Sequence, residues 1–188
     1  MKLIKRINHW VLGAAVLISL ISGVQAQTNT NQVVDASSQL KKLDVWVGDW
    51  TYVGVERKNP LEKEGPFSGK LSSKWVLNNS FIETHWEEKN PTGNLEGVEI
   101  HGYDALSKRY FSHAYSSDGV TMMGTGFHSQ NTWVETAKMT DKDGKAMMVR
   151  TVSRFTDENQ SVAVTWDLSQ DEGKTWTPWL NFTMKKAK

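Results

Sequence analysis

From Val47 to the end of the chain, short runs of aromatic and β-branched residues alternate with polar residues, and turn signals interrupt them roughly every ten residues. This period-2 pattern is typical of antiparallel strands with one buried face. The expected strands cover residues 47–56, 67–77, 80–89, 94–103, 109–116, 119–128, 131–139, 145–156, 160–169 and 175–185.

The turns between these runs are short and carry the residues that tight turns require. They include Asn78-Asn79, the segment 91–94 (P-T-G-N), the segment 104–108, Ser117-Asp118-Gly119 and the segment 141–144 (D-K-D-G). About ten sequential strands joined in this way predict an all-β, up-and-down antiparallel barrel, since closure hides the strand edges. A two-sheet sandwich with crossing connections is the alternative.

The first 26 residues have the pattern of a secretory signal peptide. A basic start (K-L-I-K-R, 2–6) precedes an apolar run over 10–21, and Val24 and Ala26 are small residues suited to a cleavage site. We expect cleavage after Ala26 and a periplasmic or secreted protein. The alternative is an uncleaved membrane anchor, for which the apolar run is short of the roughly 20 residues that a spanning helix needs.

Residues 27–38 are polar and aperiodic and are expected to form a flexible leader, with the barrel domain over 39–188. The segment Q-L-K-K-L-D-V-W (39–46) predicts one or two turns of helix before the first strand. Ser37 or Ser38 is its candidate N-cap.

Composition excludes several kinds of site and partner. The chain has no Cys, which excludes disulfides, Cys-based zinc sites and Cys nucleophiles. The formal net charge is only +1 and the basic residues are scattered, so no nucleic-acid partner is expected. No second apolar segment is long enough for a membrane span, and no phosphate-binding or dinucleotide motif predicts a cofactor.

Four His lie beyond the leader, on four different expected strands: His85, His101, His113 and His128. No two of them have the H-x-H or H-x-x-x-H spacing of metal ligands, and no metal site is predicted. A haem-binding barrel would need one of them to point into the interior, and the sequence does not select which.

Alternation groups other polar side chains around these His. His101 and His113 lie on strands joined by one turn and can meet on one face, each with a Tyr two positions further on. Glu83 shares a face with His85 in the same way. Such side chains either form a polar cluster inside the barrel, or face solvent or the core. Arg150 and Arg154 interrupt an apolar strand; either would anchor an anion if it pointed inward, and the alternative is that both lie on the solvent-facing outer surface. The candidate ligand-binding residues are therefore Trp50, Glu83, His85, His101, Tyr103, His113, Tyr115 and Arg150.

Trp is abundant, with nine residues of which all but Trp10 lie beyond the expected signal peptide. These side chains either line a pocket for an apolar or ring-bearing ligand or fill the barrel and seal its ends.

A family resemblance rests on several motifs. Gly48-Asp49-Trp50 resembles the G-x-W signature of lipocalins, which follows a short helical turn and opens the first strand. With L-x-x-L before it, W-V-L-N-N-S-F-I-E (75–83), G-V-E-I-H-G-Y-D (97–104) and a late S-x-D-x-G-x-T-W turn, the chain resembles the bacterial lipocalin-like family catalogued as domain of unknown function 1579. The resemblance spans nearly all of 40–185. It implies a calycin-like barrel and no established reaction. In lipocalins the Trp of the motif closes one end of the barrel and an Arg often stacks on it, so the resemblance also implies Arg150 or Arg154 against Trp50 as a possibility.

The segment S-Q-D-E-G-K-T-W (169–176) also resembles the Asp-box of sialidases. It occurs once, in a chain too short for a multi-bladed propeller, so we interpret it as the turn between the last two strands. Asp171 would accept backbone N–H groups there, Gly173 would supply an unusual φ, and Trp176 would pack beneath the hairpin.

These observations favour an exported barrel that binds a small hydrophobic or aromatic molecule in its interior. The first alternative is a small-molecule enzyme (an isomerase, cyclase or hydrolase) that uses a His/Tyr/Glu cluster in the barrel, with catalytic residues that the sequence does not identify. A haem-binding barrel and an envelope interaction protein without a ligand are the other hypotheses. The sequence does not determine the oligomeric state.

Overall fold

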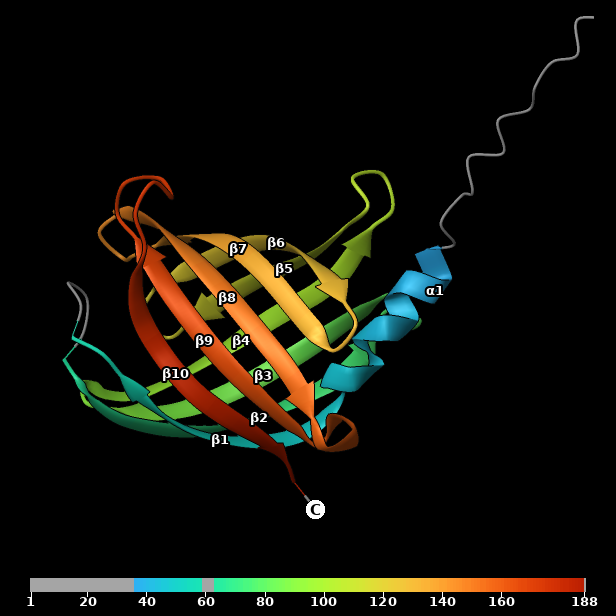
Figure 1. Cartoon of the computed structure of the whole chain (residues 1–188), viewed down its shortest axis with the longest axis horizontal. Coiled ribbons are helices and arrows are strands. Elements are labelled where there is room, and N and C mark those ends of the chain that lie inside the picture. Colours follow the sequence, from blue (N-terminus) through green and yellow to red (C-terminus); the bar gives the residue numbers. More distant parts are fainter. Residues whose placement is uncertain (1–35, 59–62, 188) are drawn as a thin grey trace, which may run out of the picture. The chain divides into compact units, whose positions relative to one another are not determined.

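The structure is a computed structural model that describes residues 36–58 and 63–187. The ten strands form one closed antiparallel barrel, in which each strand pairs with the next and β1 pairs with β10 (Figure 1). The elements are α1 (Ala36–Lys41), η1 (Lys42–Trp46), β1 (Gly48–Glu56), β2 (Gly65–Val76), β3 (Phe81–Asn90), β4 (Gly93–Asp104), β5 (Arg109–Ser116), β6 (Thr121–Ser129), β7 (Thr132–Thr140), β8 (Ala146–Thr156), η2 (Asp157–Asn159), β9 (Ser161–Ser169) and β10 (Thr177–Lys186).

The predicted barrel is confirmed, and each strand end lies within two residues of its expected position. The closed strand order excludes the two-sheet sandwich. The expected signal peptide (1–26) and residues 27–35 of the expected leader lie outside the described residues. Within the described ranges, no helix has the length and apolar character that a membrane crossing requires.

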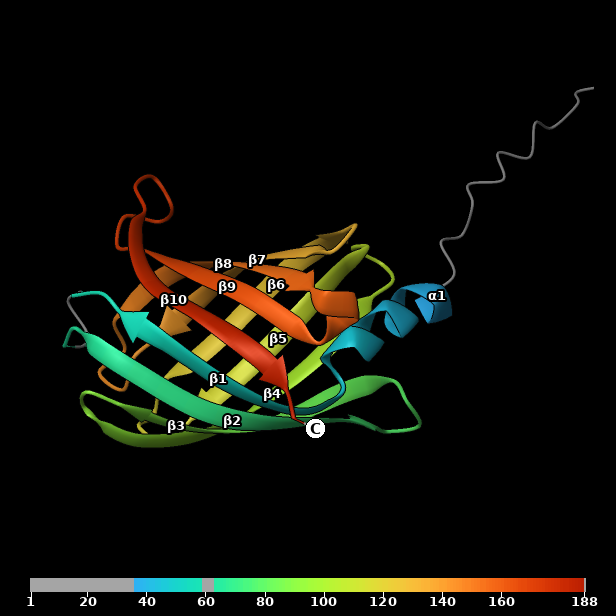
Figure 2. The same cartoon turned by 60° about the horizontal axis from the view of Figure 1, so that its bottom comes forward.

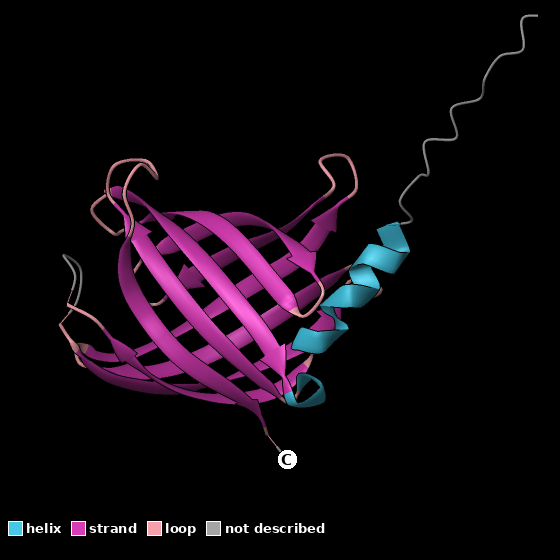
Figure 3. Cartoon of the chain, in the orientation of Figure 1, coloured by secondary structure: helices cyan, strands magenta, loops and turns pink. Residues whose placement is uncertain are grey.

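The short helical segment lies at one end of the barrel, as predicted (Figure 3). It begins at Ala36, so Ser37 and Ser38 lie inside its first turn rather than before it. Leu43 of η1 is buried with Trp50 and Phe155 in the main apolar cluster. This end of the barrel, which we call the closed end, is therefore sealed by side chains.

Aromatic contacts and hydrogen bonds attach the helical segment to the strands. The Trp46 ring meets Phe155 edge-on with centroids 4.7 Å apart. The Trp50 indole N–H donates to the Trp46 carbonyl over 3.0 Å. The Tyr110 hydroxyl lies 3.1 Å from the carbonyl oxygen of Gln39, to which it can donate, and 3.0 Å from the side-chain oxygen of the same residue. Trp50, the Trp of the G-x-W motif, thus closes this end of the barrel.

Short side chains at the turns complete the backbone hydrogen bonding of the hairpins. Asn90 Oδ1 accepts the N–H groups of Thr92 and Gly93 in the β3–β4 turn. Asp104 Oδ1 accepts the N–H of Leu106, and Asp141 Oδ1 accepts the N–H of Lys145. Such side-chain acceptors satisfy backbone N–H groups that the tight turns leave without a strand partner.

Glycine on the inner face gives room to large neighbouring side chains. A Cβ on Gly97 would collide with the Trp86 ring, and one on Gly124 would collide with the carboxylate of Glu135. The inward direction of Trp86 and Glu135 therefore depends on a missing side chain on the adjacent strand.

Candidate functional site

The barrel encloses a cavity of about 600 Å³. Its walls are inner-face residues of all ten strands, and it reaches residues of the β5–β6 and β7–β8 connections, including Asp118, Val120 and Lys142. These connections lie at the end opposite the helical segment, so we call this end the mouth. A volume of this size falls in the range of small-molecule sites.

Aromatic side chains form much of the cavity wall. The aromatic lining residues that point inward include Trp46, Tyr52, Phe67, Trp86, Tyr110, Trp133, Trp166, Trp179 and Phe182. Some also pack on each other: the rings of Trp166 and Trp179 have centroids 5.6 Å apart. The Trp-rich composition therefore serves both uses that the sequence left open, sealing the closed end and lining a pocket.

A polar cluster lies within these aromatic walls. His101 Nε2 lies 3.3 Å from Glu99 Oε2, two residues before it on the same face of β4. The hydroxyl of Ser112, on β5, lies 2.6 Å from Glu135 Oε1 on β7 and also hydrogen-bonds to Glu99. We call Glu99, His101, Ser112 and Glu135 the interior cluster.

Burial and charge act against each other in the interior cluster. Burial opposes the ionised form of Glu99, but His101 and Ser112 outweigh it and lower the pKa of this carboxyl. Burial likewise opposes the imidazolium, yet Glu99 and then Glu135 raise the pKa of His101. For Glu135, burial and the neighbouring Glu99 both raise the pKa. Relative to free side chains, the cluster therefore favours an ionised Glu99, a charged His101 and the protonated form of Glu135.

A second polar group lies nearer the mouth and comes from β1, β3 and β10. The Tyr52 hydroxyl is 3.3 Å from Glu88 Oε2, and Asn90 Nδ2 donates to Glu88 Oε1 over 3.2 Å. The Trp179 indole N–H donates to Glu56 Oε1 over 2.9 Å. Burial, followed by the nearby charge of Glu56, raises the pKa of Glu88.

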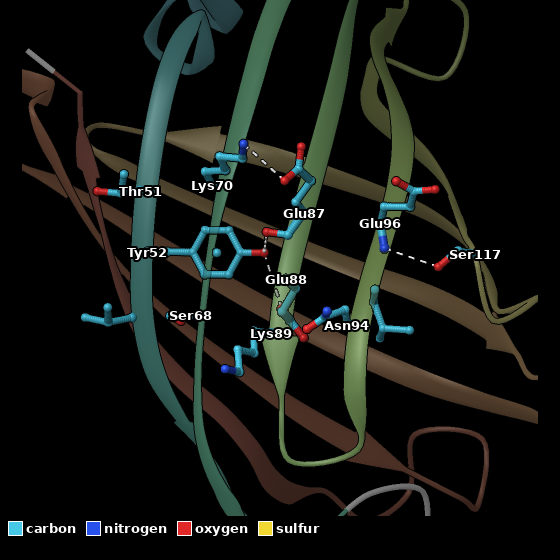
Figure 4. Close-up of a pocket in the computed structure, with 13 residues that line it drawn as sticks. Thr51, Tyr52, Ser68, Lys70, Glu87, Glu88, Lys89, Asn94, Glu96 and Ser117 are labelled. Atoms are coloured by element: carbon cyan, nitrogen blue, oxygen red, sulfur yellow. Dashed lines mark hydrogen bonds and ion pairs between the residues drawn. The ribbon is translucent and has the colours of Figure 1, made fainter.

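A shallow groove on the outer face of β1–β4 lies behind this second group (Figure 4). Gly69 has no side chain where the Tyr52 ring crosses β2, so Tyr52 and Glu88 border both the groove and the cavity. The remaining wall is largely exposed and includes the 3.1 Å ion pair of Lys70 with Glu87. The enclosed cavity, with its apolar walls, is the better candidate site.

Of the sequence-predicted site residues, His101 is the one whose side chain joins the interior cluster. His113 pairs with Ile100, and its neighbours Ser112 and Ala114 face inward, so its own side chain lies on the outer face. The prediction that His101 and His113 can meet on one face is therefore wrong. Ser112, not His113, pairs with His101 across β4 and β5.

Glu83 and His85, like the two candidate Tyr residues, lie outside the interior cluster. Glu83 and His85 do share a face and lie 3.0 Å apart, but this is the outer face, where the His85 side chain is 62% exposed. Tyr115 is also on the outer face and exposed. Tyr103 faces inward near the closed end, with its ring 5.0 Å from that of Tyr110. The set His101, Tyr103, His113 and Glu83 thus does not converge.

Arg150 and Trp50 do not meet. The Arg150 side chain is outside the barrel, where its Nη2 is 2.7 Å from Asp167 and its guanidinium lies 4.6 Å from the centre of the Trp176 ring. The cation over Trp50 is instead Lys186, with Nζ 5.2 Å from the ring centre. The expected cation–aromatic stack on the G-x-W Trp exists, but β10 supplies the cation.

Sequence reasoning missed the interior carboxylates Glu56, Glu88, Glu99 and Glu135 as a group. Glu99 had a usable signal, because it precedes His101 by two residues and so shares its face. Glu135 had a weaker one, since it alternates with Trp133 and Ala137. A carboxylate on an aromatic face is normally assigned to solvent, which is why these positions were not selected.

The interior does not fit haem. His101 Nε2, the atom that would bind the haem iron, is paired with Glu99 Oε2, and the charge of Glu135 also raises the pKa of this imidazole. Among the described lining residues, Lys142 at the mouth is the only Lys or Arg that could pair with propionates. No group of three or more His, Cys, Asp or Glu in the described ranges is placed to hold a metal ion.

The Asp-box segment forms the hairpin connection of β9 and β10, as interpreted from the sequence. Asp171 Oδ1 accepts the Thr175 N–H over 2.9 Å, and its Oδ2 accepts the Thr175 hydroxyl over 2.6 Å. Ser169 donates to Asp171 over 2.7 Å, and Gly173 has a φ of +85°. The motif is a turn at the mouth end (upper left in Figure 1).

Comparison with known proteins supports the fold. The chain resembles a solved structure titled "Crystal Structure of Rv2717c from M. tuberculosis", with a TM-score of 0.60 and 10% sequence identity, over 79% of this chain and 97% of that chain. At this identity the likeness shows the fold alone. No curated protein matches the chain. A family profile described as "Protein of unknown function (DUF1579)" matches residues 36–186, and the chain therefore belongs to that family.

Proposed function

We propose that this protein binds a small apolar or aromatic molecule inside its barrel. The observation that carries the proposal is the cavity of about 600 Å³, whose largely apolar wall combines aromatic and aliphatic side chains with a smaller number of polar ones. An interior filled by its own side chains, as in many small barrels, would have argued against it. We further propose that the protein is exported, on the signal-peptide pattern of residues 1–26.

A second candidate function is acid–base catalysis on the bound molecule. It is favoured by the interior cluster, in which Glu99 and His101 are paired and burial and Glu99 raise the pKa of Glu135. An enclosed, water-poor site with acid and base groups of different pKa is the arrangement that proton-transfer enzymes use. Catalysis would be supported if the wild type converts a bound ligand chemically, and if His101→Gln still binds this ligand but no longer converts it.

The binding proposal is tested by filling the cavity. Ala114 on β5 lines it, whereas Ala163 on β9 is exposed on the outer face, so Ala114→Trp and Ala163→Trp form a matched pair. The probe is N-phenyl-1-naphthylamine, an uncharged aromatic whose fluorescence rises in apolar surroundings. We expect wild type and Ala163→Trp to bind it, and Ala114→Trp to bind at least about tenfold more weakly.

Circular dichroism and urea unfolding would show whether both variants keep the fold. The proposal fails if the wild-type barrel binds neither this probe nor other uncharged aromatic probes. It also fails if a folded Ala114→Trp binds as well as Ala163→Trp.

A further inference from the structure

Among the described residues, more acidic than basic side chains line the cavity. The inward carboxyl groups come from four strands: Glu56 on β1, Glu88 on β3, Glu99 on β4 and Glu135 on β7. Among the described lining residues, His101 is the only basic group away from the mouth. Within the interior cluster, one imidazole therefore faces two carboxyl groups, Glu99 and Glu135.

Glu99 and Glu135 are held close enough to interact. They project from β4 and β7 toward Ser112 of β5, which hydrogen-bonds to both. The absence of a Cβ at Gly124 leaves the space that the Glu135 carboxylate occupies. Two carboxylates in one enclosed site cannot both be ionised cheaply without a cation.

The strands packed around Glu135 bring one basic group to it. β4 contributes Glu99 and His101, β5 contributes the Ser112 hydroxyl, β6 contributes Gly124, and β8 contributes Thr151, which pairs with Glu135. His101 is the basic group among them and is already paired with Glu99. Burial and the neighbouring Glu99 therefore favour a proton on Glu135 when no cation is bound.

The described residues at the mouth also carry more negative than positive charge. Asp118, Asp141 and Asp143 border it, and the one Lys there, Lys142, lies 3.2 Å from Asp143. Acidic groups around an apolar opening raise the local concentration of cations and repel anions.

We propose that the ligand is an organic cation, an apolar or aromatic body with a protonated amine that lies between Glu99 and Glu135. This inference rests on the proposed binding function and adds the ligand's charge. The ammonium group donates to both carboxylates, takes the place of the proton on Glu135, and meets aromatic walls that favour cations. Binding therefore releases the Glu135 proton to solvent.

The test compares three naphthalene derivatives of similar size by titration calorimetry at neutral pH: 2-(1-naphthyl)ethylamine, 2-(1-naphthyl)ethanol and 3-(1-naphthyl)propanoate. We expect the amine to bind at least about tenfold more tightly than the alcohol, and the propanoate most weakly, because only the amine satisfies the two carboxylates. The heat for the amine, but not for the alcohol, should change between phosphate and Tris buffers, since these take up a released proton with different enthalpies.

Glu135→Gln and Glu99→Gln should each remove most of the preference for the amine over the alcohol. Glu87→Gln is the matched control, because Glu87 lies on the exposed outer face of β3 and pairs with Lys70; it should keep the preference.

The inference is overturned if the alcohol or the propanoate binds as tightly as the amine to a barrel that does bind aromatic probes. A buffer-independent heat for the amine also overturns it, and this measurement needs no variant to fold. If neither the three compounds nor N-phenyl-1-naphthylamine binds, the proposed function itself fails.

Discussion

The indole N–H of Trp179 donates a 2.9 Å hydrogen bond to Oε1 of Glu56, and this bond joins β10 to β1 on the inner face of the barrel. Glu56 is 1% exposed and Trp179 is 6% exposed. A buried donor that loses its acceptor costs more than the net value of the bond itself.

Glu56→Leu should therefore lower the free energy of unfolding by about 1–3 kcal/mol, while Glu56→Gln, which keeps a side-chain oxygen, should lower it by less. Urea unfolding measures both. The same Leu substitution in a Trp179→Phe background should cost less than in the wild type, because no indole N–H is then left unpaired. Equal costs in the two backgrounds would contradict a stabilising role for this bond.

The Asp171 carboxylate should make the stability of the barrel depend on pH in the acid range. The hydrogen bonds from Thr175, and then that from Ser169, hold its pKa below the ordinary value. A depressed pKa means that the stabilisation is fully present above the unfolded-state value of about 3.9 and is lost as the pH falls toward the folded-state value. Asp171→Asn should therefore have a lower Tm than the wild type at pH 7, and the gap should narrow below about pH 4.

Asp143→Asn provides the control for that measurement. Asp143 belongs to another turn at the mouth and its carboxylate contacts the exposed Lys142. Its Tm difference from the wild type should be smaller at pH 7. A gap for Asp171→Asn that stays constant from pH 7 to pH 3 would show that the carboxylate charge does not matter.

The pairing of His101 with Glu99 should be visible in a titration of the imidazole. Burial disfavours the charged ring, and Glu99 more than compensates, so the pKa of His101 is raised. In Glu99→Gln burial still disfavours the charged ring but its main compensation is lost, so the pKa of His101 should fall below the usual value of about 6.5. Nuclear magnetic resonance of the His101 side chain in the wild type and in Glu99→Gln measures both pKa values.

Gly124 should be intolerant of a side chain because of Glu135. A Cβ at this position would collide with the carboxylate and push it away from Ser112, so Gly124→Ala should cost about 1 kcal/mol or more of stability. In a Glu135→Ala background the collision disappears, and the same substitution should cost much less. A cost that is the same in both backgrounds would place its cause in the β6 backbone instead.

The closed end should respond to alkaline pH through Tyr110. Burial, and to a lesser degree the neighbouring Tyr103, raises the pKa of Tyr110 to about 12. Because the unfolded-state value is about 10, the folded barrel should lose stability as the pH rises from about 10 to 12. Absorbance at 295 nm should show a Tyr titration near pH 12 that is absent in Tyr110→Phe, and this variant should lack that part of the alkaline loss of stability.

Strand positions were predictable because two local signals agree. The alternation in V-T-W-D-L (164–168) names its inner face, and turn residues such as Asn90 and Asp141 mark where strands end. Both signals lie within a few neighbouring residues. The family resemblance added the closure and the function of Trp50, which a single strand cannot indicate.

The site was less predictable because it depends on register between strands. His113 was grouped with His101 although the pairing of β4 with β5 puts Ser112 opposite His101. A shift of one residue exchanges the two faces, and the turn at 104–108 does not reveal that shift in sequence. Where both faces of a strand carry aromatic or polar residues, as with His85 and Trp86, alternation cannot tell which face is inside.

The pairing of β1 with β10 brings together residues as distant in sequence as Trp50 and Lys186 (Figure 2). The pairing of β1 with β10 supplies a large part of the contacts between residues that are far apart in the sequence. Such contacts have the highest entropic cost of loop closure, and they slow folding. Until the last strand is in place, both β1 and β9 present unpaired edges that can recruit another chain. Aggregation during folding should therefore depend more on residues 177–186 than on any hairpin, and substitutions that weaken this strand should reduce the yield of soluble protein before they reduce the stability of the finished barrel.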